Sequence, residues 1–202
     1  MQELLIITPV KDSIDHTVRT MEAVVQSELS VPHRYVVYND YSTPENTARL
    51  HAEGQRLGVE VVDLASLTDH PSPNYLFVLR RCRKEALAAD AGLLIVESDV
   101  TVEQDTLQKL FDGAKARTNC GIAAAVTVDE EGKINYPYLY ARGNEGKDYD
   151  CKKHCSFCCS LLTPALLKAC DFDRLDDSKN WFDVTISHDS LAAGLHNYLF
   201  CS

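Results

Sequence analysis

The sequence predicts an α/β fold: a mostly parallel central sheet covered by helices on both faces, in a single domain. Short β-branched runs alternate with amphipathic segments through the first half, as in βαβ units. Gly92–Val96 is wholly apolar, which is typical of a strand buried on both faces of a parallel sheet. The chain has 202 residues, 45% hydrophobic and 25% charged, which suits one globular domain.

The first half is expected to hold four strands, each followed by a helix or a helix start. The predicted strands are Leu4–Thr8, Tyr35–Tyr38, Val59–Leu64 and Gly92–Val96. Between the first two strands, apolar residues recur at spacings of four, three and four, which places them on one helix face ending before Pro32. These residues are Ile14, Val18, Met21 and Val25. Further helices are predicted from Ser42–Glu45 and over Leu76–Ala89, the first with a cap residue and an early Pro.

In the second half, a cap over Thr101–Gln104 is expected to precede a helix whose apolar face carries Leu107, Leu110, Phe111 and Ala114. Tyr136–Asp150, rich in Tyr, Gly and charge, is predicted to be a long functional loop. The other predicted elements are strands Cys120–Val128, Cys159–Thr163 and Asn197–Phe200, and helices Pro164–Cys170 and Val184–Ala193.

Charge and the N-terminus limit the classes of partner. The formal net charge of −10 disfavours nucleic acid, since that affinity comes largely from Lys and Arg. A nucleotide stays possible if a metal or a few local cations neutralise its phosphates. Met1-Gln2-Glu3 lacks the positive charge of a signal peptide, and no stretch is long enough for a transmembrane segment. We therefore expect a cytoplasmic protein whose eight cysteines are mostly reduced.

Polar residues gather directly after the predicted strands. Lys11-Asp12 follows the first strand, Asn39-Asp40 the second, and Glu97-Ser98-Asp99 the buried fourth. In open α/β sheets, ligands bind beyond the carboxyl ends of the strands. Glu97 and Asp99 can aim two carboxylates at one Mg²⁺ or Mn²⁺ whose other ligands are substrate phosphates. Alternatively, these acids only cap the next helix.

Several segments resemble family 2 glycosyltransferases, whose fold is called GT-A. Ile6-Ile7-Thr8-Pro9-Val10-Lys11-Asp12 is similar to the opening strand and turn of that family, and Val37-Tyr38-Asn39-Asp40-Tyr41-Ser42-Thr43 to its nucleobase-reading loop. Arg81 to Asp99 resembles the stretch from an Arg-Asn pair to the Asp-x-Asp motif. Cys158–Asp173 and Phe182–Gly194 resemble the acceptor-side segments, so the likeness spans nearly the whole chain.

The resemblance implies a nucleotide-sugar-binding half over residues 1–100 and an acceptor half over residues 101–202. In the first half, Pro9, Val10 and Lys11 would lie against the nucleoside, Asp40 would accept from the base, and Arg81 would meet the diphosphate. Glu97 and Ser98 would lie near the donor, and Asp99 with Glu97 would hold Mn²⁺ or Mg²⁺. Arg81 could instead belong to a solvated helix face with Arg80, Arg83 and Lys84.

The implied reaction is the inverting transfer of one sugar from a nucleotide diphosphate, with UDP favoured by family habit, to an acceptor hydroxyl. The acceptor class, whether glycan, lipid-linked or small molecule, stays open. Asp183 would be the general base, or else only a cap of the helix starting near Val184. The sequence departs from the family pattern at Lys11, Asn39, Glu97 and Phe182. It also lacks the Gln-x-x-Arg-Trp motif of processive synthases, which favours single addition.

Other functions stay open. A sugar-phosphate nucleotidyltransferase uses a related sheet, but Thr8–Ser13 lacks the glycine-rich loop that such enzymes carry. A catalytically degenerate sugar-nucleotide-binding module is the non-enzyme alternative. The segment Cys151–Cys159, with His154, could hold Zn²⁺, although packing of reduced thiols suits its spacing better.

Overall fold

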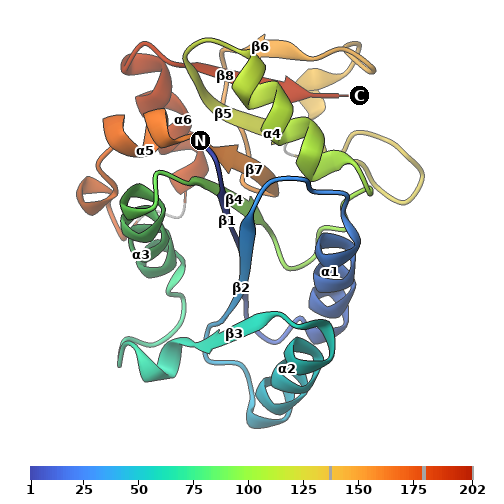
Figure 1. The fold of residues 1–202 in the computed structure, drawn as a ribbon, viewed down its shortest axis with the longest axis vertical. Helices are drawn as coiled ribbons and strands as arrows, with labels where there is room; N and C mark the ends of the chain where they lie inside the picture. The colour runs from blue at the N-terminus through green and yellow to red at the C-terminus, as the bar shows by residue number, and fades with distance from the viewer. Residues whose placement is uncertain (137, 179–180, 202) are drawn as a thin grey trace.

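A computed structural model describes residues 1–136, 138–178 and 181–201 of the chain. One sheet runs through the molecule in the order β3-β2-β1-β4-β7-β5-β8-β6 (Figure 1). Its strands are β1 (Leu4–Val10), β2 (His33–Asn39), β3 (Glu60–Asp63), β4 (Gly92–Val96), β5 (Cys120–Ala125), β6 (Tyr149–Cys151), β7 (Cys159–Leu162) and β8 (His196–Phe200).

Helices cover both faces of this sheet. They are α1 (Ile14–Gln26), α2 (Pro44–Leu57), α3 (Tyr75–Ala88), α4 (Thr106–Ala116), α5 (Pro164–Ala169) and α6 (Phe182–Ala192), with short 3-10 turns η1 (Leu64–Ser66), η2 (Leu139–Ala141) and η3 (Phe172–Arg174). Figure 1 shows α3, α5 and α6 on one side and α1, α2 and α4 on the other. The predicted arrangement of helices on both faces is confirmed.

Two hydrophobic cores follow from this layering, one on each face of the sheet. Alternate residues of the apolar strand β4 enter different cores: Leu93 and Ile95 pack with α3, α5 and α6, whereas Leu94 and Val96 pack with α1, α2 and α4. Side chains of a strand point alternately to its two faces, so a strand covered on both sides must be apolar throughout. This explains why Gly92–Val96 carries no polar residue.

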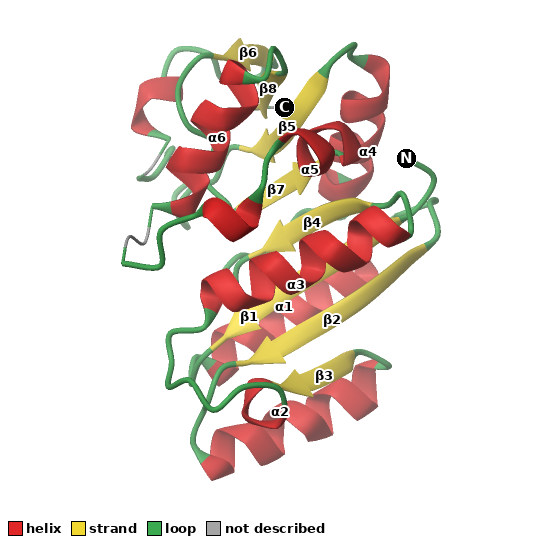
Figure 2. Ribbon diagram, turned by 90° about the vertical axis from the view of Figure 1, so that its left-hand side faces the viewer, coloured by secondary structure: helices red, strands yellow, loops and turns green. Residues whose placement is uncertain are grey.

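The direction of the strands sets the position of the functional edge. β1 runs parallel to β2 and to β4, so the loops after Val10, Asn39 and Val96 leave the sheet on one side, as Figure 2 shows. β7 is antiparallel to β4 and pairs Cys159 with Val96, so the segment just before β7 reaches the same edge. The end of the chain returns as β8, parallel to β5.

Several elements differ from the sequence-based prediction. α4 begins at Thr106, later than the cap predicted over Thr101–Gln104. Before it, the Gln104 carbonyl accepts a hydrogen bond from Glu28 N at 2.8 Å, which ties this segment to the one after α1. β5 ends at Ala125, and Val128 instead forms an isolated bridge with Ile134. The segment predicted as a loop over Tyr136–Asp150 contains η2 and the start of β6; its Pro137 lies outside the described residues.

The predicted burial of Val25 is also wrong. The sequence places this residue on the buried stripe of α1, but it is 45% exposed. The helix ends one residue later, at Gln26, and its last turn buries the neighbouring Val24 instead. Across the part of the chain that the structure describes, every helix is too short or too polar to cross a membrane.

Candidate active site

The loops after β1 and β2 are bound to each other at the functional edge. Asp40 N donates to the Val10 carbonyl at 2.7 Å, which continues the pairing of the two strands by one residue. The Asp12 carboxylate accepts from Thr43 N at 2.7 Å and from Asn46 Nδ2 at 3.1 Å. Asp12 adopts a φ of 59°, a left-handed conformation that Asp tolerates better than most residues. The hydrogen bonds with the start of α2 therefore fix the loop that carries Lys11.

A cavity of about 240 Å³ lies between these loops and α3. The residues predicted to bind the nucleoside, Pro9, Val10, Lys11 and Asp40, all line it, together with Glu97. The other lining residues are Leu64, Ser72, Pro73, Asn74, Tyr75 and Val78. We call this space the nucleoside-side cavity. It offers a mainly apolar wall, one ammonium group and two carboxylates.

Asp40 is buried at 8% exposure and already has several partners within the protein. Its Oδ2 accepts from Ser72 Oγ at 2.7 Å and from Asn74 N at 2.8 Å, while Oδ1 accepts from Asn74 Nδ2 at 2.8 Å. A carboxylate oxygen has two lone pairs, so Oδ1 can accept one further hydrogen bond. Asp40 therefore anchors the segment before α3, and it also has capacity for one ligand N–H.

A second cavity, of about 440 Å³, brings three acids together and is called here the acid cavity. Glu97 and Asp99 enter it from the loop after β4, and Asp183 enters it from the first turn of α6. Its other lining residues are Pro73, Tyr75, Ser156, Phe157, Cys158 and Phe182. Because Pro73, Tyr75 and Glu97 also line the nucleoside-side cavity, the two spaces are neighbours with a shared wall.

The backbone explains how distant segments meet in the acid cavity. Glu97 N donates to the Cys158 carbonyl at 2.9 Å, which extends the antiparallel pairing of β4 and β7 past the end of β4. The segment before β7 therefore lies beside Glu97. α6 is held against this segment by Ser187, whose Oγ accepts from Cys155 N at 2.9 Å. This contact sets the start of α6, and hence Asp183, at the same edge of the sheet.

Burial and like charge shape the electrostatics of the acid cavity. Burial, reinforced by the nearby Asp99 and Asp183 carboxylates, raises the pKa of Glu97 to about 7, although the hydrogen bond from Tyr75 opposes the shift. Burial also raises the pKa of Asp183, against the opposing hydrogen bond from Val184 N. The Asp99 and Asp183 carboxylates thus make ionisation of Glu97 more costly, and a group of acids of this kind forms a region where a cation is stabilised.

A divalent cation fits this donor set only with help from a ligand. Among the described residues, no three His, Cys, Asp or Glu side chains are grouped closely enough to hold a metal by themselves. Mg²⁺ and Mn²⁺ favour oxygen donors, and Mg²⁺ is commonly held by one or two carboxylates plus substrate phosphates. Glu97 and Asp99 meet that requirement in chemistry and number. The pair therefore suits a metal that arrives with, or is completed by, a diphosphate.

Two predicted donor-site residues lie elsewhere. Arg81 is exposed on α3 and lines a separate hollow with Phe77, Arg80 and Lys84. Ser98 lies between the two acids in sequence, but it is absent from the described residues that line either cavity. The structure thus brings together Pro9, Val10, Lys11, Asp40, Glu97, Asp99 and Asp183, and it leaves Arg81 and Ser98 outside.

The sequence analysis missed Tyr75, which lines both cavities. Its hydroxyl donates to Glu97 Oε1 at 2.8 Å, and its ring stacks on Phe182 with centroids 6.2 Å apart. The available signal was an aromatic residue at a helix start, directly after Ser72-Pro73-Asn74. That signal is weak because a Tyr at such a position is as often simply part of the core.

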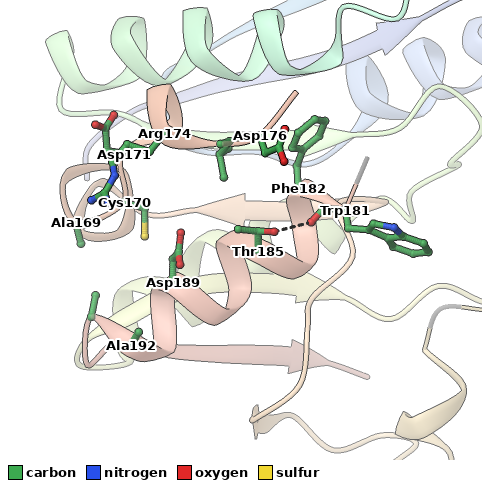
Figure 3. A pocket seen from close by; sticks show the side chains of 12 residues that line it. Ala169, Cys170, Asp171, Arg174, Asp176, Trp181, Phe182, Thr185, Asp189 and Ala192 are labelled. Carbon is green, nitrogen blue, oxygen red and sulfur yellow. Dashed lines mark hydrogen bonds between the residues drawn. The ribbon is translucent and has the colours of Figure 1, made fainter. Parts of the chain in front are cut away.

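A further hollow of about 550 Å³ lies between α6 and the segment from α5 to η3. Figure 3 shows Asp189 and Thr185 on the α6 side of it, with Cys170, Asp171 and Arg174 opposite. Phe182 lines both this hollow and the acid cavity. Trp181, at 63% exposure, also lines the hollow near the start of α6.

The cysteine-rich segment packs mainly as apolar thiols. All eight cysteines are free, and Cys151, Cys155 and Cys159 are buried. Cys158 and Cys159 face different environments, since Cys158 lines the acid cavity and Cys159 packs in the core shared with α1, α2 and α4. Within the described part of the chain, His154 and these thiols form no group able to hold a metal.

The fold is similar to that of several glycosyltransferases of known structure. Residues 1–349 of S. aureus TarS in complex with UDP-GlcNAc align with a TM-score of 0.69 and 14% identity, over 99% of this chain and 56% of that one. The mannosyltransferase PcManGT from Pyrobaculum calidifontis, in complex with GDP-Man and Mn²⁺, aligns with a TM-score of 0.65 and 14% identity. That alignment covers 96% of this chain and 53% of the PcManGT chain. The chain thus spans little more than half the length of the chains in these two structures.

A third similar structure is glucosyl-3-phosphoglycerate synthase from Mycobacterium tuberculosis with UDP, at a TM-score of 0.55 and 15% identity over 83% of this chain and 59% of that one. These likenesses confirm the GT-A type of fold expected from the sequence. No family model matches the sequence, and no curated protein matches it either.

Proposed function

We propose that the chain is a metal-dependent glycosyltransferase that moves one sugar from a nucleotide diphosphate to an acceptor hydroxyl, with inversion at the anomeric carbon. The observation that carries the proposal is the meeting of Glu97, Asp99 and Asp183 in one cavity beside the nucleoside-side cavity. These acids come from opposite halves of the chain. A site that joins donor-side and acceptor-side acids is what a direct transfer between two bound substrates requires.

The donor would lie along the shared wall of the two cavities. The nucleoside would pack between Pro9, Val10 and Lys11, and the remaining lone pair on Asp40 Oδ1 would accept an N–H of the base. A uracil ring supplies such an N–H. TarS and the glucosyl-3-phosphoglycerate synthase bind UDP or UDP-GlcNAc, whereas PcManGT binds GDP-Man. We favour UDP because two of these three complexes contain a uridine nucleotide.

The metal would be held by Asp99 and Glu97, with the diphosphate supplying further oxygens. A bound Mn²⁺ or Mg²⁺ stabilises negative charge on the departing diphosphate. Asp99 is exposed, which leaves its carboxylate accessible to an arriving metal–nucleotide complex. The Mn²⁺ in the PcManGT complex supports the choice of metal.

Asp183 would act as the general base on the acceptor side. Its carboxylate lines the acid cavity from α6, opposite the loop after β4. Burial raises its pKa, which makes the carboxylate a better proton acceptor than an exposed Asp. Asp183 would take the proton of the acceptor hydroxyl as that oxygen attacks. A single displacement of this kind inverts the configuration of the sugar.

The acceptor would be a hydroxyl group of a glycan, a lipid-linked molecule or a small molecule. Eight free thiols favour a reducing compartment such as the cytoplasm for the reaction. The net charge of −10 disfavours nucleic acid as an acceptor, since it would repel a phosphate backbone.

The test combines binding and turnover. Thermal shift with UDP, GDP and inorganic pyrophosphate, each with and without Mn²⁺, should show the largest stabilisation for UDP with Mn²⁺. Release of UDP from UDP-sugars should then require Mn²⁺ or Mg²⁺. The proposal fails if neither UDP nor GDP stabilises the protein in the presence of Mn²⁺.

A sugar-nucleotide-binding module without turnover is the second candidate. It is favoured by the position of Arg81, which lines a separate hollow and leaves the diphosphate without the expected guanidinium. Such a module would show the metal-dependent stabilisation by UDP but no release of UDP from any UDP-sugar, with or without candidate acceptors. Turnover thus separates the two candidates.

A further inference from the structure

Among the described side chains, Tyr75 makes specific contacts with both the donor-side and the acceptor-side segments of the acid cavity. Its hydroxyl donates a hydrogen bond to Glu97 Oε1 at 2.8 Å. Its ring lies almost parallel to that of Phe182, at 7° between planes and 6.2 Å between centroids. Phe182 directly precedes Asp183 in the first turn of α6. One residue therefore contacts Glu97 and the neighbour of Asp183.

Tyr75 is itself held in place from the other side. The preceding residue, Asn74, is buried and binds both carboxylate oxygens of Asp40. The Asn74 carbonyl accepts from Val78 N at 3.1 Å, which closes the first turn of α3. The start of α3 is thus anchored to the loop after β2.

Glu97 has a fixed backbone but needs a partner to fix its side chain. Its amide donates to the Cys158 carbonyl at 2.9 Å, and its carbonyl accepts from Val100 N at 3.1 Å. Among the described residues, the hydroxyl of Tyr75 donates a hydrogen bond to this carboxylate. With Oε1 bound to the phenol, Oε2 is left for another ligand. A carboxylate held in this way loses less conformational freedom when it binds a metal.

We propose that Tyr75 is a positioning residue that orients Glu97 toward the metal and diphosphate and ties Phe182, the neighbour of Asp183, to the same wall. This inference rests on the proposed function, because it assigns a role within that site. Partners that orient a metal ligand typically contribute about 10–100-fold to metal affinity. The hydroxyl of Tyr75 contacts Glu97 and its ring contacts Phe182, so the two contacts can be removed by separate substitutions.

The experiment measures the affinity for Mn²⁺ in the presence of saturating UDP, by electron paramagnetic resonance of free Mn²⁺. Tyr75→Phe removes the hydroxyl and keeps the ring, and Phe182→Leu removes the stacking partner and keeps the hydroxyl on Glu97. The matched control is Tyr35→Phe, which deletes another buried hydroxyl, bound to Thr8 Oγ1 at 2.9 Å in the opposite core. Urea unfolding of each variant verifies that it is folded.

We expect Tyr75→Phe to weaken Mn²⁺ binding by about 10-fold or more, with Tyr35→Phe and Phe182→Leu within about threefold of the parent. In a Glu97→Gln background, Tyr75→Phe should cause no further loss, because its partner carboxylate is gone. A purely structural role would instead give the same loss in both backgrounds.

The inference is overturned if Tyr75→Phe binds Mn²⁺ as tightly as Tyr35→Phe, or if Phe182→Leu loses as much affinity as Tyr75→Phe. Both results would leave the proposed function intact, since the parent still binds metal and nucleotide. Failure of the parent protein to bind Mn²⁺ with UDP overturns the inference and the proposed function together. The two kinds of failure are thus distinguishable.

Discussion

Asn74 binds both carboxylate oxygens of Asp40, through its backbone N–H to Oδ2 and its side-chain amide to Oδ1, each at 2.8 Å. Asp40 directly follows Asn39, the last residue in the parallel register of β1 and β2, and Asn74 precedes α3. The pair therefore joins the nucleobase-side loop to the helix that carries Tyr75. A residue predicted to bind ligand is at the same time part of the framework of the site.

We predict that Asp40→Ala lowers the free energy of unfolding by about 2–3 kcal/mol, because it leaves the buried Asn74 N–H and amide without their charged acceptor. Urea unfolding measures the effect. In a double-mutant cycle, Asp40→Ala and Asn74→Ala should show a coupling of about 0.5 kcal/mol or more. Strictly additive losses would contradict the proposed linkage of the two residues.

Base recognition by Asp40 makes a separate prediction. Asp40→Ala should weaken UDP much more than inorganic pyrophosphate, because it removes the acceptor Oδ1 and only UDP offers that oxygen an N–H. Isothermal titration calorimetry in the presence of Mn²⁺ gives, for each of the two ligands, the ratio of the dissociation constants of the variant and the parent. Asn74→Ala is the control, since it disturbs the same loop and keeps the carboxylate. If Asn74→Ala reproduces the loss for UDP, the effect belongs to the loop and Asp40 does not read the base.

Asp99→Ala should abolish the part of the UDP affinity that depends on Mn²⁺ and leave the stability of the metal-free protein close to the parent value. The reason is that Asp99 is exposed and would contribute its carboxylate only to the metal. Titration of UDP with Mn²⁺ and with EDTA provides the measurement. Asp105→Ala, at an exposed acid before α4, is the control and should keep the full metal effect. Equal UDP affinity of the parent with and without metal would refute the prediction.

Glu97 predicts a dependence of stability on pH in the metal-free protein. The pKa of Glu97 in the folded protein, about 7, lies above its ordinary value of 4.5. The contribution of Glu97 to the free energy of unfolding is therefore most favourable below pH 4.5, and it is lost as the pH rises through 7. Glu97→Gln removes this loss. Relative to the parent, it should therefore be more stable at pH 8 than at pH 5 by about 1–3 kcal/mol.

Urea unfolding in EDTA at the two pH values tests this effect. Glu103→Gln serves as the control, since it removes an exposed carboxylate from the same loop region. A difference between Glu97→Gln and the parent that is the same at both pH values would show that Glu97 titrates normally.

Asp183→Asn should retain UDP and Mn²⁺ binding while sugar transfer falls by about 10²–10⁴-fold, the usual contribution of a general base. Release of UDP from the UDP-sugar that the parent uses is the measurement. Asp189→Asn changes an acid on the same helix that lines the other hollow, and it should keep nearly the parent rate. Transfer by Asp183→Asn at the parent rate would leave Asp183 as a helix-start residue only.

The sequence by itself determined the elements and the edge where the site lies. Hydrophobic periodicity and the wholly apolar Gly92–Val96 depend on local patterns, and these correctly predicted the layered sheet. Because parallel strands end at one edge, the polar residues after β1, β2 and β4 had to lie near one another, as Lys11, Asp40 and Glu97 do. That prediction needs only strand direction, which βαβ alternation provides.

Only the tertiary structure decided which distant side chains join this edge. Asp183 reaches Glu97 because antiparallel β7 returns beside β4 and α6 packs on the segment before β7. Tyr75 meets Glu97, and Arg81 turns to a separate hollow, through the rotation of α3 about its own axis. The rotation of α3 and the antiparallel pairing of β7 with β4 are fixed by packing between elements far apart in sequence. Local sequence patterns therefore do not predict them.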